Sequence, residues 1–221
     1  MAEITAQIVK DLRERTGAGM MDCKKALGET KGNFEGAAKW LREKGIASAA
    51  KRDSRTAAEG AVASYIHMGG KIGVLVEVNC ETDFVAKGEP FQEFIKDVCL
   101  QICSTAPRWV RRNEVTADVL EEEKSIYRKQ ALHSGKPANI VDKIADGKMN
   151  KFYEDNCLLE QKFVKNPDVT IESLMKELSG KVGEKVDIRR FVRYQLGEGI
   201  EKKQSNLAEE VAAAVAAAKG N

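Results

Sequence analysis

The apolar residues of this chain follow a helical spacing up to about residue 45 and change, after Gly60, to a spacing of two. In the first stretch they recur every three or four positions, at Ile4, Ile8, Leu12, Met20, Cys23, Leu27, Phe34, Ala38 and Leu41. Between residues 62 and 80 they alternate with small or polar residues, as in a strand with one buried face. Because these two periods belong to different backbone geometries, the chain must join a helical unit to a unit built on a sheet.

The helical spacing predicts a module of three short helices over residues 1–46. Thr5 suits the cap of the first helix, and Gly17 interrupts the chain before the second. Asn33 suits the cap of the third helix, and Gly45 stands where a glycine commonly ends one. A unit of this size is near the lower limit for independent folding.

Residues 47–59 contain no large apolar side chain, so they cannot bury a face of their own. Their composition predicts a charged linker. We therefore expect the first module to be mobile.

Residues 60–200 are expected to form an α+β core. The alternating runs on either side of Gly69-Gly70 predict a β-hairpin, and residues 186–196 predict a further strand of an antiparallel or mixed sheet. In this last strand, simple alternation places Ile188, Val192 and Tyr194 on one face and Asp187, Arg189, Phe191 and Arg193 on the other.

Helices are expected to pack on this sheet. Pro90 suits the first turn of a helix whose apolar face, Phe91, Ile95, Val98 and Ile102, would cover the sheet. Residues 116–160 predict a helical hairpin capped at Thr116, and Thr170 can cap another short helix. Residues 201–221 predict a C-terminal helix with Leu207, Val211 and Val215 on one side.

The sequence lacks the usual equipment of an enzyme. It has two histidines and no nucleophile elbow, zinc-protease motif or phosphate-binding loop, so we expect no catalytic residues, no metal and no cofactor. The glycines after Met68 lie between two strands, which favours a tight turn over a phosphate loop.

Two cysteine arrangements leave an alternative open. Cys99 and Cys103 share a helix face, which favours buried core over a metal site because no histidine accompanies them. Cys80 with His67 and Asp83 is imaginable as a thiol-protease set, since their strands are expected to be neighbours, although no neighbour in the sequence lowers the pKa of that thiol.

Charge and cysteine usage bear on location and partners. The net charge of +2 comes from two nearly equal populations, so no overall field favours direct binding of nucleic acid. The five cysteines form no C-x-x-C pair and are expected to be reduced and buried. No stretch approaches the ~20 apolar residues that span a membrane, and with no signal peptide expected, the cytoplasm is the predicted compartment.

Two segments resist a purely structural interpretation. Met20 and Met21 are adjacent and cannot both face the core of a small module, so at least one is expected on the surface, where methionine suits an adaptable protein contact. Phe84 follows Asp83 where a strand ends and a capped turn begins, and it either folds back on the sheet or projects from the tip.

These two segments resemble the signatures of the elongation factor Ts family. Residues 15–27 (RTGAGMMDCKKAL) resemble the first signature, in a module similar to ubiquitin-associated domains, and residues 76–87 (VEVNCETDFVAK) resemble the second. Residues 64–67, 148–152 and 197–201 add to the likeness. The resemblance implies a non-catalytic guanine-nucleotide exchange factor that loosens GDP from elongation factor Tu during translation elongation.

The resemblance also implies roles for particular residues. Leu12, Met20 and Met21 would grip a helix of the partner's GTPase domain, with help from the C-terminal helix. Within the motif Thr82, Asp83, Phe84 and Val85, Asp83 and Phe84 would enter the partner near its magnesium and phosphate site. His67 would contact the partner's nucleotide-binding domain.

The chain resembles the short form of the family, with one copy of the β-hairpin. This form implies a homodimer with isologous contacts on the sheet or on the helical hairpin. The alternative from the residues alone is an adaptor whose three-helix module binds ubiquitin-like or other helical partners without an effect on nucleotide.

Overall fold

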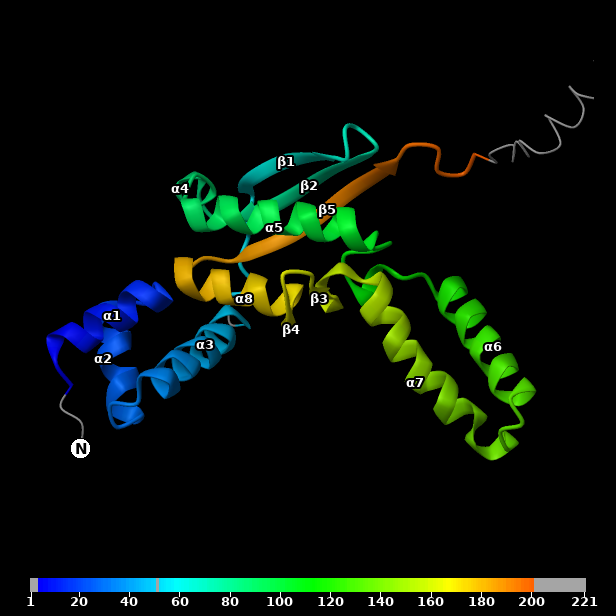
Figure 1. Ribbon diagram of the computed structural model, residues 1–221, viewed down its shortest axis with the longest axis horizontal. Helices are drawn as coiled ribbons and strands as arrows, with labels where there is room; N and C mark the ends of the chain where they lie inside the picture. The colour runs from blue at the N-terminus through cyan, green and yellow to red at the C-terminus, as the bar shows by residue number, and fades with distance from the viewer. Residues whose placement is uncertain (1–3, 51, 201–221) are drawn as a thin grey trace, which may run out of the picture.

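The computed structural model describes the backbone of residues 4–50 and 52–200, together with their side chains except at residues 46–50 (Figure 1). Its N-terminal part is the predicted three-helix module, made of α1 (Ala6–Thr16), α2 (Met20–Glu29) and α3 (Phe34–Ala50). The Thr5 side chain accepts the Ile8 N–H, Gly17 ends α1 in the left-handed conformation, and the Asn33 side chain accepts the Gly36 N–H at 2.8 Å. The predicted caps are confirmed.

The predicted end of the third helix at Gly45 is wrong. Helix α3 continues through Gly45 to Ala50 and so includes residues 47–50, the first residues of the expected linker. Gly45 instead lies against Gly180 of α8 (Ile171–Val182), where a Cβ built on Gly180 would be 2.8 Å from the Gly45 Cα. The two glycines therefore allow a close helix crossing, which a sequence reading of either helix alone cannot reveal.

The core contains the predicted sheet, and it is entirely antiparallel. Strands β1 (Glu59–His67) and β2 (Ile72–Cys80) form the hairpin, and β5 (Val186–Gln195) pairs with the other edge of β2. Residues 68–71 form the tight turn, with Gly69 and Gly70 at positive φ.

Simple alternation along β5 is wrong beyond Ile188. A β-bulge shifts the register, so that Ile188 pairs with Val78 and Arg190 with Glu77 while Arg189 is passed over. An extra residue in one strand moves every later side chain to the opposite face. Val186 and Ile188 consequently face the core before the bulge, and Phe191 faces it afterwards, leaving Val192 and Tyr194 exposed on the outer face.

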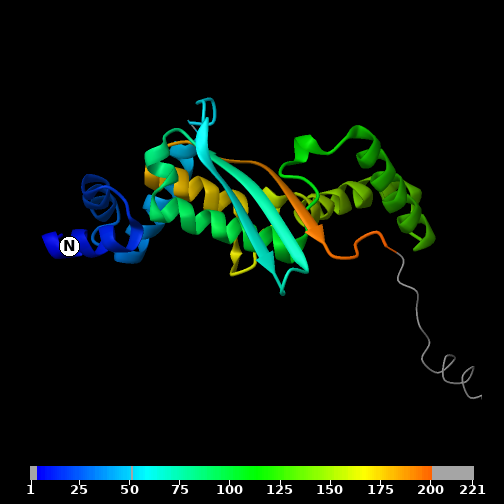
Figure 2. The same cartoon turned by 90° about the horizontal axis from the view of Figure 1, so that it is seen from above.

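Two helices, α5 (Glu89–Thr105) and α8, pack on the inner face of the sheet. Helix α5 begins with Pro90 in its first turn, and Figure 2 shows the strands crossing above it. Its predicted apolar face is confirmed, since Phe91, Ile95, Val98 and Ile102 are all at most 2% exposed. Burial of side chains of this size contributes about 1.5–3 kcal/mol each, which makes this interface a main source of stability.

Two further helices, α6 (Ala117–His133) and α7 (Ala138–Asn156), form the predicted hairpin, which projects from the core (Figure 1). Helix α6 follows Thr116, whose side chain makes no capping hydrogen bond, and α7 returns to the core. The 3₁₀ turns η1 (Arg112–Glu114) and η2 (Leu158–Glu160) and the small hairpin of β3 (Lys162–Phe163) and β4 (Asn166–Thr170) were not predicted. The Thr170 side chain caps α8 through the Ser173 N–H, as predicted.

The three-helix module packs on α8 through α3. Besides the glycine crossing, Arg42 forms an ion pair with Glu177 at 3.2 Å. The short connection that follows is also attached to the core, because the Lys185 ammonium donates to the backbone oxygens of Asp53 and Arg55 at 2.7 and 3.0 Å. In this structure, therefore, residues 52–55 are held by the core and do not form a free tether.

The predicted C-terminal helix over residues 201–221 lies outside the described residues. Among the helices that the structure does describe, none combines the length and apolarity needed to cross a bilayer.

Candidate partner-binding site

Phe84 projects from a single helical turn at one end of the sheet. After β2 ends at Cys80, Thr82 caps the turn α4 (Asp83–Ala86), and its hydroxyl accepts the Val85 N–H at 3.4 Å. Ala86 is buried and Val85 is half-buried against the core, whereas Phe84 is 86% exposed. The sequence left two orientations open for Phe84, and the structure selects the projecting one.

Asp83, beside this aromatic ring, is also at the surface. Its carboxylate forms an ion pair with Lys87 at 2.7 Å, one turn further along. The hydrogen bond from Lys87, followed by the attraction of its charge, holds the pKa of Asp83 below the usual value. The tip therefore presents an exposed aromatic ring next to an ionised acid.

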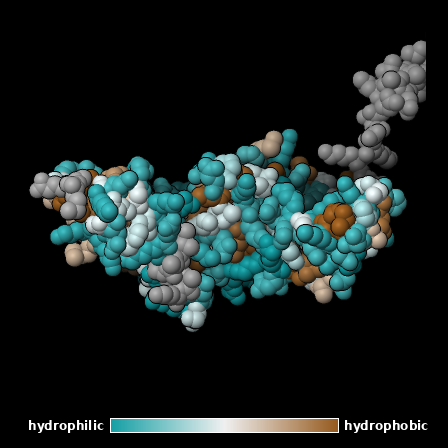
Figure 3. All heavy atoms as spheres, turned by 90° about the horizontal axis from the view of Figure 1, so that it is seen from below, coloured by the Kyte–Doolittle hydropathy of each residue, from teal (hydrophilic) through white to brown (hydrophobic). Residues whose placement is uncertain are grey.

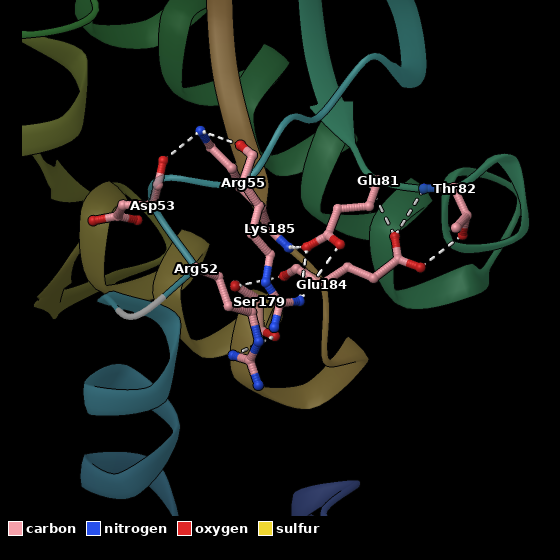
Figure 4. Close-up of polar contacts among 8 residues, drawn as sticks. All are labelled: Arg52, Asp53, Arg55, Glu81, Thr82, Ser179, Glu184 and Lys185. Atoms are coloured by element: carbon pink, nitrogen blue, oxygen red, sulfur yellow. Dashed lines mark hydrogen bonds and ion pairs between the residues drawn. The ribbon is translucent and has the colours of Figure 1, made fainter.

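The underside of the turn is fixed by polar contacts with the loop between α8 and β5 (Figure 4). The Glu184 carboxylate accepts the backbone N–H groups of Glu81 and Thr82 at 3.1 and 3.0 Å, and the Thr82 hydroxyl donates to it at 2.7 Å. The Glu81 carboxylate in turn accepts the Lys185 N–H at 2.6 Å. Neither Glu184 nor Lys185 was singled out from the sequence, since about a hundred residues separate them from the turn and no local pattern indicates the contact.

Cys80 does not have the surroundings of a reactive thiol. It is fully buried and donates to the Thr82 carbonyl oxygen at 3.1 Å. Burial, together with the negative charge of Glu184, raises the pKa of this thiol to about 11. His67 pairs with Ile72 at the far end of the strands, so the imagined set of Cys80, His67 and Asp83 is not brought together.

The other cysteines are also buried. Cys99 and Cys103 are 2% and 4% exposed within the core, as predicted. Among the described residues, no cluster of three or more His, Cys, Asp or Glu side chains has an arrangement that could hold a metal ion.

The methionines of the three-helix module form a second exposed feature. Met20 and Met21 begin α2 and are 46% and 76% exposed, which confirms that at least one of them lies on the surface. Leu12 does not accompany them, because it is 0% exposed in the core of the module with Cys23 and Leu27. In this conformation Leu12 supports the module from inside, and its contact with a partner stays a prediction.

His67 lies far from Phe84. Its ring stacks on Tyr65, whose hydroxyl lies 3.0 Å from His67 Nδ1. Glu59 pairs with Cys80 next to the Phe84 turn, and the eight-residue step from Glu59 to His67 corresponds to about 27 Å of strand. The structure thus brings Thr82, Asp83, Phe84 and Val85 together and leaves His67 and the two methionines at separate places.

The outer face of the sheet is uncovered by the described residues, and exposed apolar side chains share it with the ion pair of Glu77 and Arg190. Its exposed apolar side chains come from all three strands and are Val62, Ile66, Leu75, Val192 and Tyr194. Leu75 and Val192 are directly paired neighbours at its centre. This set, which we call the outer sheet face, has the character of a protein contact surface.

A smaller apolar area lies on the helical hairpin. The surface seen from below is mostly hydrophilic, with an apolar area over the hairpin (Figure 3). Ile126, Leu132 and Ile140 are the large apolar residues of α6 and α7 that are exposed. The hairpin thus offers a second, less extensive contact surface.

Comparisons with known proteins show a close likeness to one family. The family described as Elongation factor TS matches residues 33–198. A protein named Elongation factor Ts from Desulforamulus reducens is 59% identical over 98% of this chain and 100% of its own length. Proteins of the same name from Geobacter metallireducens and Carboxydothermus hydrogenoformans are 60% and 56% identical, each over 96% of this chain and 98% of its own length.

Proposed function

The chain belongs to the elongation factor Ts family of translation elongation factors, and from this premise we propose that it is a guanine-nucleotide exchange factor for elongation factor Tu. The observation that carries the proposal is Phe84, an exposed aromatic side chain on a turn that Val85 and Ala86 anchor to the core. An aromatic ring on the surface of a free protein costs little to desolvate and gains much when a partner covers it.

The proposed mechanism needs no covalent chemistry. Phe84 and Asp83 insert next to the magnesium and phosphate site of the partner, while Met20 and Met21 hold its GTPase domain. The factor must bind the nucleotide-free or distorted partner more tightly than the GDP-bound partner. By linkage, each ligand then weakens the binding of the other by the same factor, so that GDP leaves and incoming GTP later releases the factor.

The same proposal makes the protein a binding factor of the cytoplasm and not an enzyme. The elevated pKa and full burial of Cys80 support this, because a nucleophilic thiol requires access and a lowered pKa. No cofactor and no direct contact with nucleic acid are needed for the mechanism.

We further propose a homodimer that forms through the outer sheet face. An isologous dimer requires a self-complementary patch, and exposed apolar side chains from three strands supply one. A second copy on this face would shield Leu75 and Val192 from water. His67 and Phe84 lie at opposite ends of one sheet, so a second copy whose strands run antiparallel to those of the first would present its His67 beside the Phe84 turn.

Sedimentation of purified protein tests the dimer. The wild type is expected to sediment as a dimer, Leu75→Asp as a monomer, and Leu132→Asp on the helical hairpin as a dimer. A monomer for Leu132→Asp with a dimer for Leu75→Asp would move the interface to the hairpin. A monomeric wild type at tens of micromolar would refute the dimer.

Release of fluorescent GDP from elongation factor Tu, measured by stopped flow at fixed magnesium, tests the exchange function. Acceleration should rise with the concentration of the factor and saturate. Phe84→Ala removes a side chain of the kind that commonly carries 2 kcal/mol or more in an interface, so we expect roughly 30-fold slower release. Val164→Ala, which truncates an exposed apolar residue in another part of the core, is the matched control and should leave the rate unchanged.

Two outcomes would contradict the proposal in different ways. Unchanged release with Phe84→Ala would remove Phe84 from the mechanism. The absence of acceleration by the wild type would refute exchange itself and favour the adaptor alternative, in which the three-helix module binds a helical partner.

A further inference from the structure

Glu184 makes three hydrogen bonds with the residues that introduce the Phe84 turn. Its carboxylate accepts hydrogen bonds from the backbone N–H groups of Glu81 and Thr82 and from the hydroxyl of Thr82. Hydrogen bonds to an ionised acceptor are about twice as strong as neutral ones. The end of β2 is therefore held by a side chain from a distant loop.

The loop that carries Glu184 is itself fixed. Gly183 ends α8 in the left-handed conformation, with φ of 79°, and directs the chain back towards the sheet. The buried hydroxyl of Ser179 donates to the Glu184 carbonyl oxygen at 2.6 Å. Because the Glu184 backbone is fixed, its carboxylate defines a fixed position for Thr82.

The hydrogen bond from Thr82 also sets the geometry of the turn. When its hydroxyl proton points to Glu184, a lone pair of the same oxygen is free for the Val85 N–H. Phe84 lies between Thr82 and Val85, so both ends of its backbone segment are fixed by this chain of contacts. The Phe84 side chain has no comparable support of its own, since it is 86% exposed.

A reciprocal contact strengthens the arrangement. The Glu81 carboxylate accepts the Lys185 N–H, and Arg55 donates to the same carboxylate at 3.2 Å. Lys185 also binds the backbone oxygens of Asp53 and Arg55 (Figure 4). The loop that positions the Phe84 turn therefore also holds the connection to the three-helix module.

We propose that Glu184 is a positioning residue for nucleotide exchange, which holds the Phe84 turn in the orientation that enters the partner. This inference rests on the proposed exchange function. Glu184 acts through Thr82 and does not touch the partner. Without the Glu184 carboxylate, Phe84 is still present, but the turn adopts several orientations. Only a fraction of these orientations can enter the partner.

The effect on exchange has a specific form. Met20 and Met21 provide a separate anchor on the three-helix module, so binding is largely retained when the turn fluctuates. We expect Glu184→Ala to lower the maximal rate of GDP release roughly tenfold, the factor that corresponds to one hydrogen bond to a charged group. The concentration of factor at half-saturation should change less than about threefold.

Two variants separate positioning from general damage. Glu184→Gln keeps an oxygen for the two backbone N–H groups and should recover most of the maximal rate. Glu114→Ala removes a carboxylate that likewise accepts a backbone N–H, that of Val110 at 2.8 Å, but it lies in the 3₁₀ turn η1 and makes no hydrogen bond to residues 81–88. It should leave the maximal rate unchanged even if it lowers the stability of the fold.

Hydrogen–deuterium exchange of the full-length variants supplies a readout that does not depend on the partner. Glu184→Ala should speed exchange in the peptide that covers residues 81–88, while Glu184→Gln and Glu114→Ala should not. Unchanged protection in Glu184→Ala, or faster deuterium exchange with an unchanged maximal rate of GDP release, would overturn the proposal. If the wild type does not accelerate the release of GDP from elongation factor Tu, the proposed function fails. The protection of residues 81–88 from deuterium exchange then still decides whether Glu184 orders the turn.

Discussion

Replacing Gly180 with alanine tests how the three-helix module is attached to the core. A Cβ at this position would lie 2.8 Å from the Gly45 Cα and 3.0 Å from the Gly45 carbonyl carbon and oxygen. These are backbone atoms, which cannot rotate away as a side chain can. The two helices must therefore separate or bend before Gly180→Ala can be accommodated.

The expected magnitude combines two opposing effects. Alanine in place of glycine in a helix interior gains about 1 kcal/mol from helix propensity. Extra volume in a packed interface costs about 1–3 kcal/mol. We therefore expect Gly180→Ala to change the free energy of unfolding by between about zero and 2 kcal/mol in the destabilising direction.

Two matched variants isolate the packing effect. Gly147, within α7, has no heavy atom within 4 Å of its added Cβ, so Gly147→Ala should gain the full propensity term of about 1 kcal/mol. A Cβ on Gly45 would be 3.9 Å from the Gly180 Cα, an ordinary contact distance. Gly45→Ala should therefore behave like Gly147→Ala although it lies at the same crossing as Gly180.

Urea unfolding followed by circular dichroism and tryptophan fluorescence provides the measurement. Trp40 lies in α3 and Trp109 lies in the core, so the two tryptophans report on the module and the core separately when each is kept alone. We expect Gly180→Ala to be about 1–3 kcal/mol less stable than Gly147→Ala, with the larger change at Trp40. Equal stabilisation by the two substitutions would refute the close crossing.

Three other predictions concern the binding residues and the thiols. Leu12→Ala should destabilise the module by about 2–5 kcal/mol, whereas Met21→Ala should change its stability by less than about 0.5 kcal/mol and weaken binding to elongation factor Tu. Thermal unfolding measures the stability, and titration with elongation factor Tu measures the binding. A stable Leu12→Ala variant with an unstable Met21→Ala variant would contradict the assigned burial. Cys80 and the other buried cysteines should react with a thiol reagent at neutral pH only after denaturation, and rapid modification of the native protein would count against this. The lowered pKa of Asp83 means that its ion pair with Lys87 favours the folded turn above the pKa of an unfolded aspartate, ~4, and is lost as the pH falls through the lowered value. Carboxyl NMR should show a higher pKa for Asp83 in Lys87→Ala, and an identical pKa would exclude the pair in solution.

The sequence predicts those parts of the fold that depend on short-range periodicity. The face of α5 formed by Phe91 and Ile95 and the hairpin around Gly69 follow from the spacing of residues along one segment. The role of Gly45 does not follow from such spacing, because Gly45 contacts Gly180 on another helix. The bulge at Arg189 is only partly evident, since the adjacent Arg189 and Arg190 interrupt the alternation of β5, but which of them is passed over depends on the pairing with β2.

The candidate site divides in the same way. The exposure of Met21 follows from local geometry, as two adjacent helical residues cannot share one buried face. The burial of Leu12 could not be predicted in this way, because a family motif does not distinguish a surface residue from one that supports it. Glu184 requires the tertiary structure, since its contact with Thr82 joins segments about a hundred residues apart.

The hairpin of β1 and β2 sets the separation of Phe84 and His67 in discrete steps. Adding two residues to each strand would keep every side chain on its face and lengthen the sheet by about 7 Å. Adding one residue to each would lengthen it by half as much but would turn the buried row of β2 outward. The distance between Phe84 and His67 can therefore change only in steps, and a variant with a different distance must gain or lose residues in pairs in each strand.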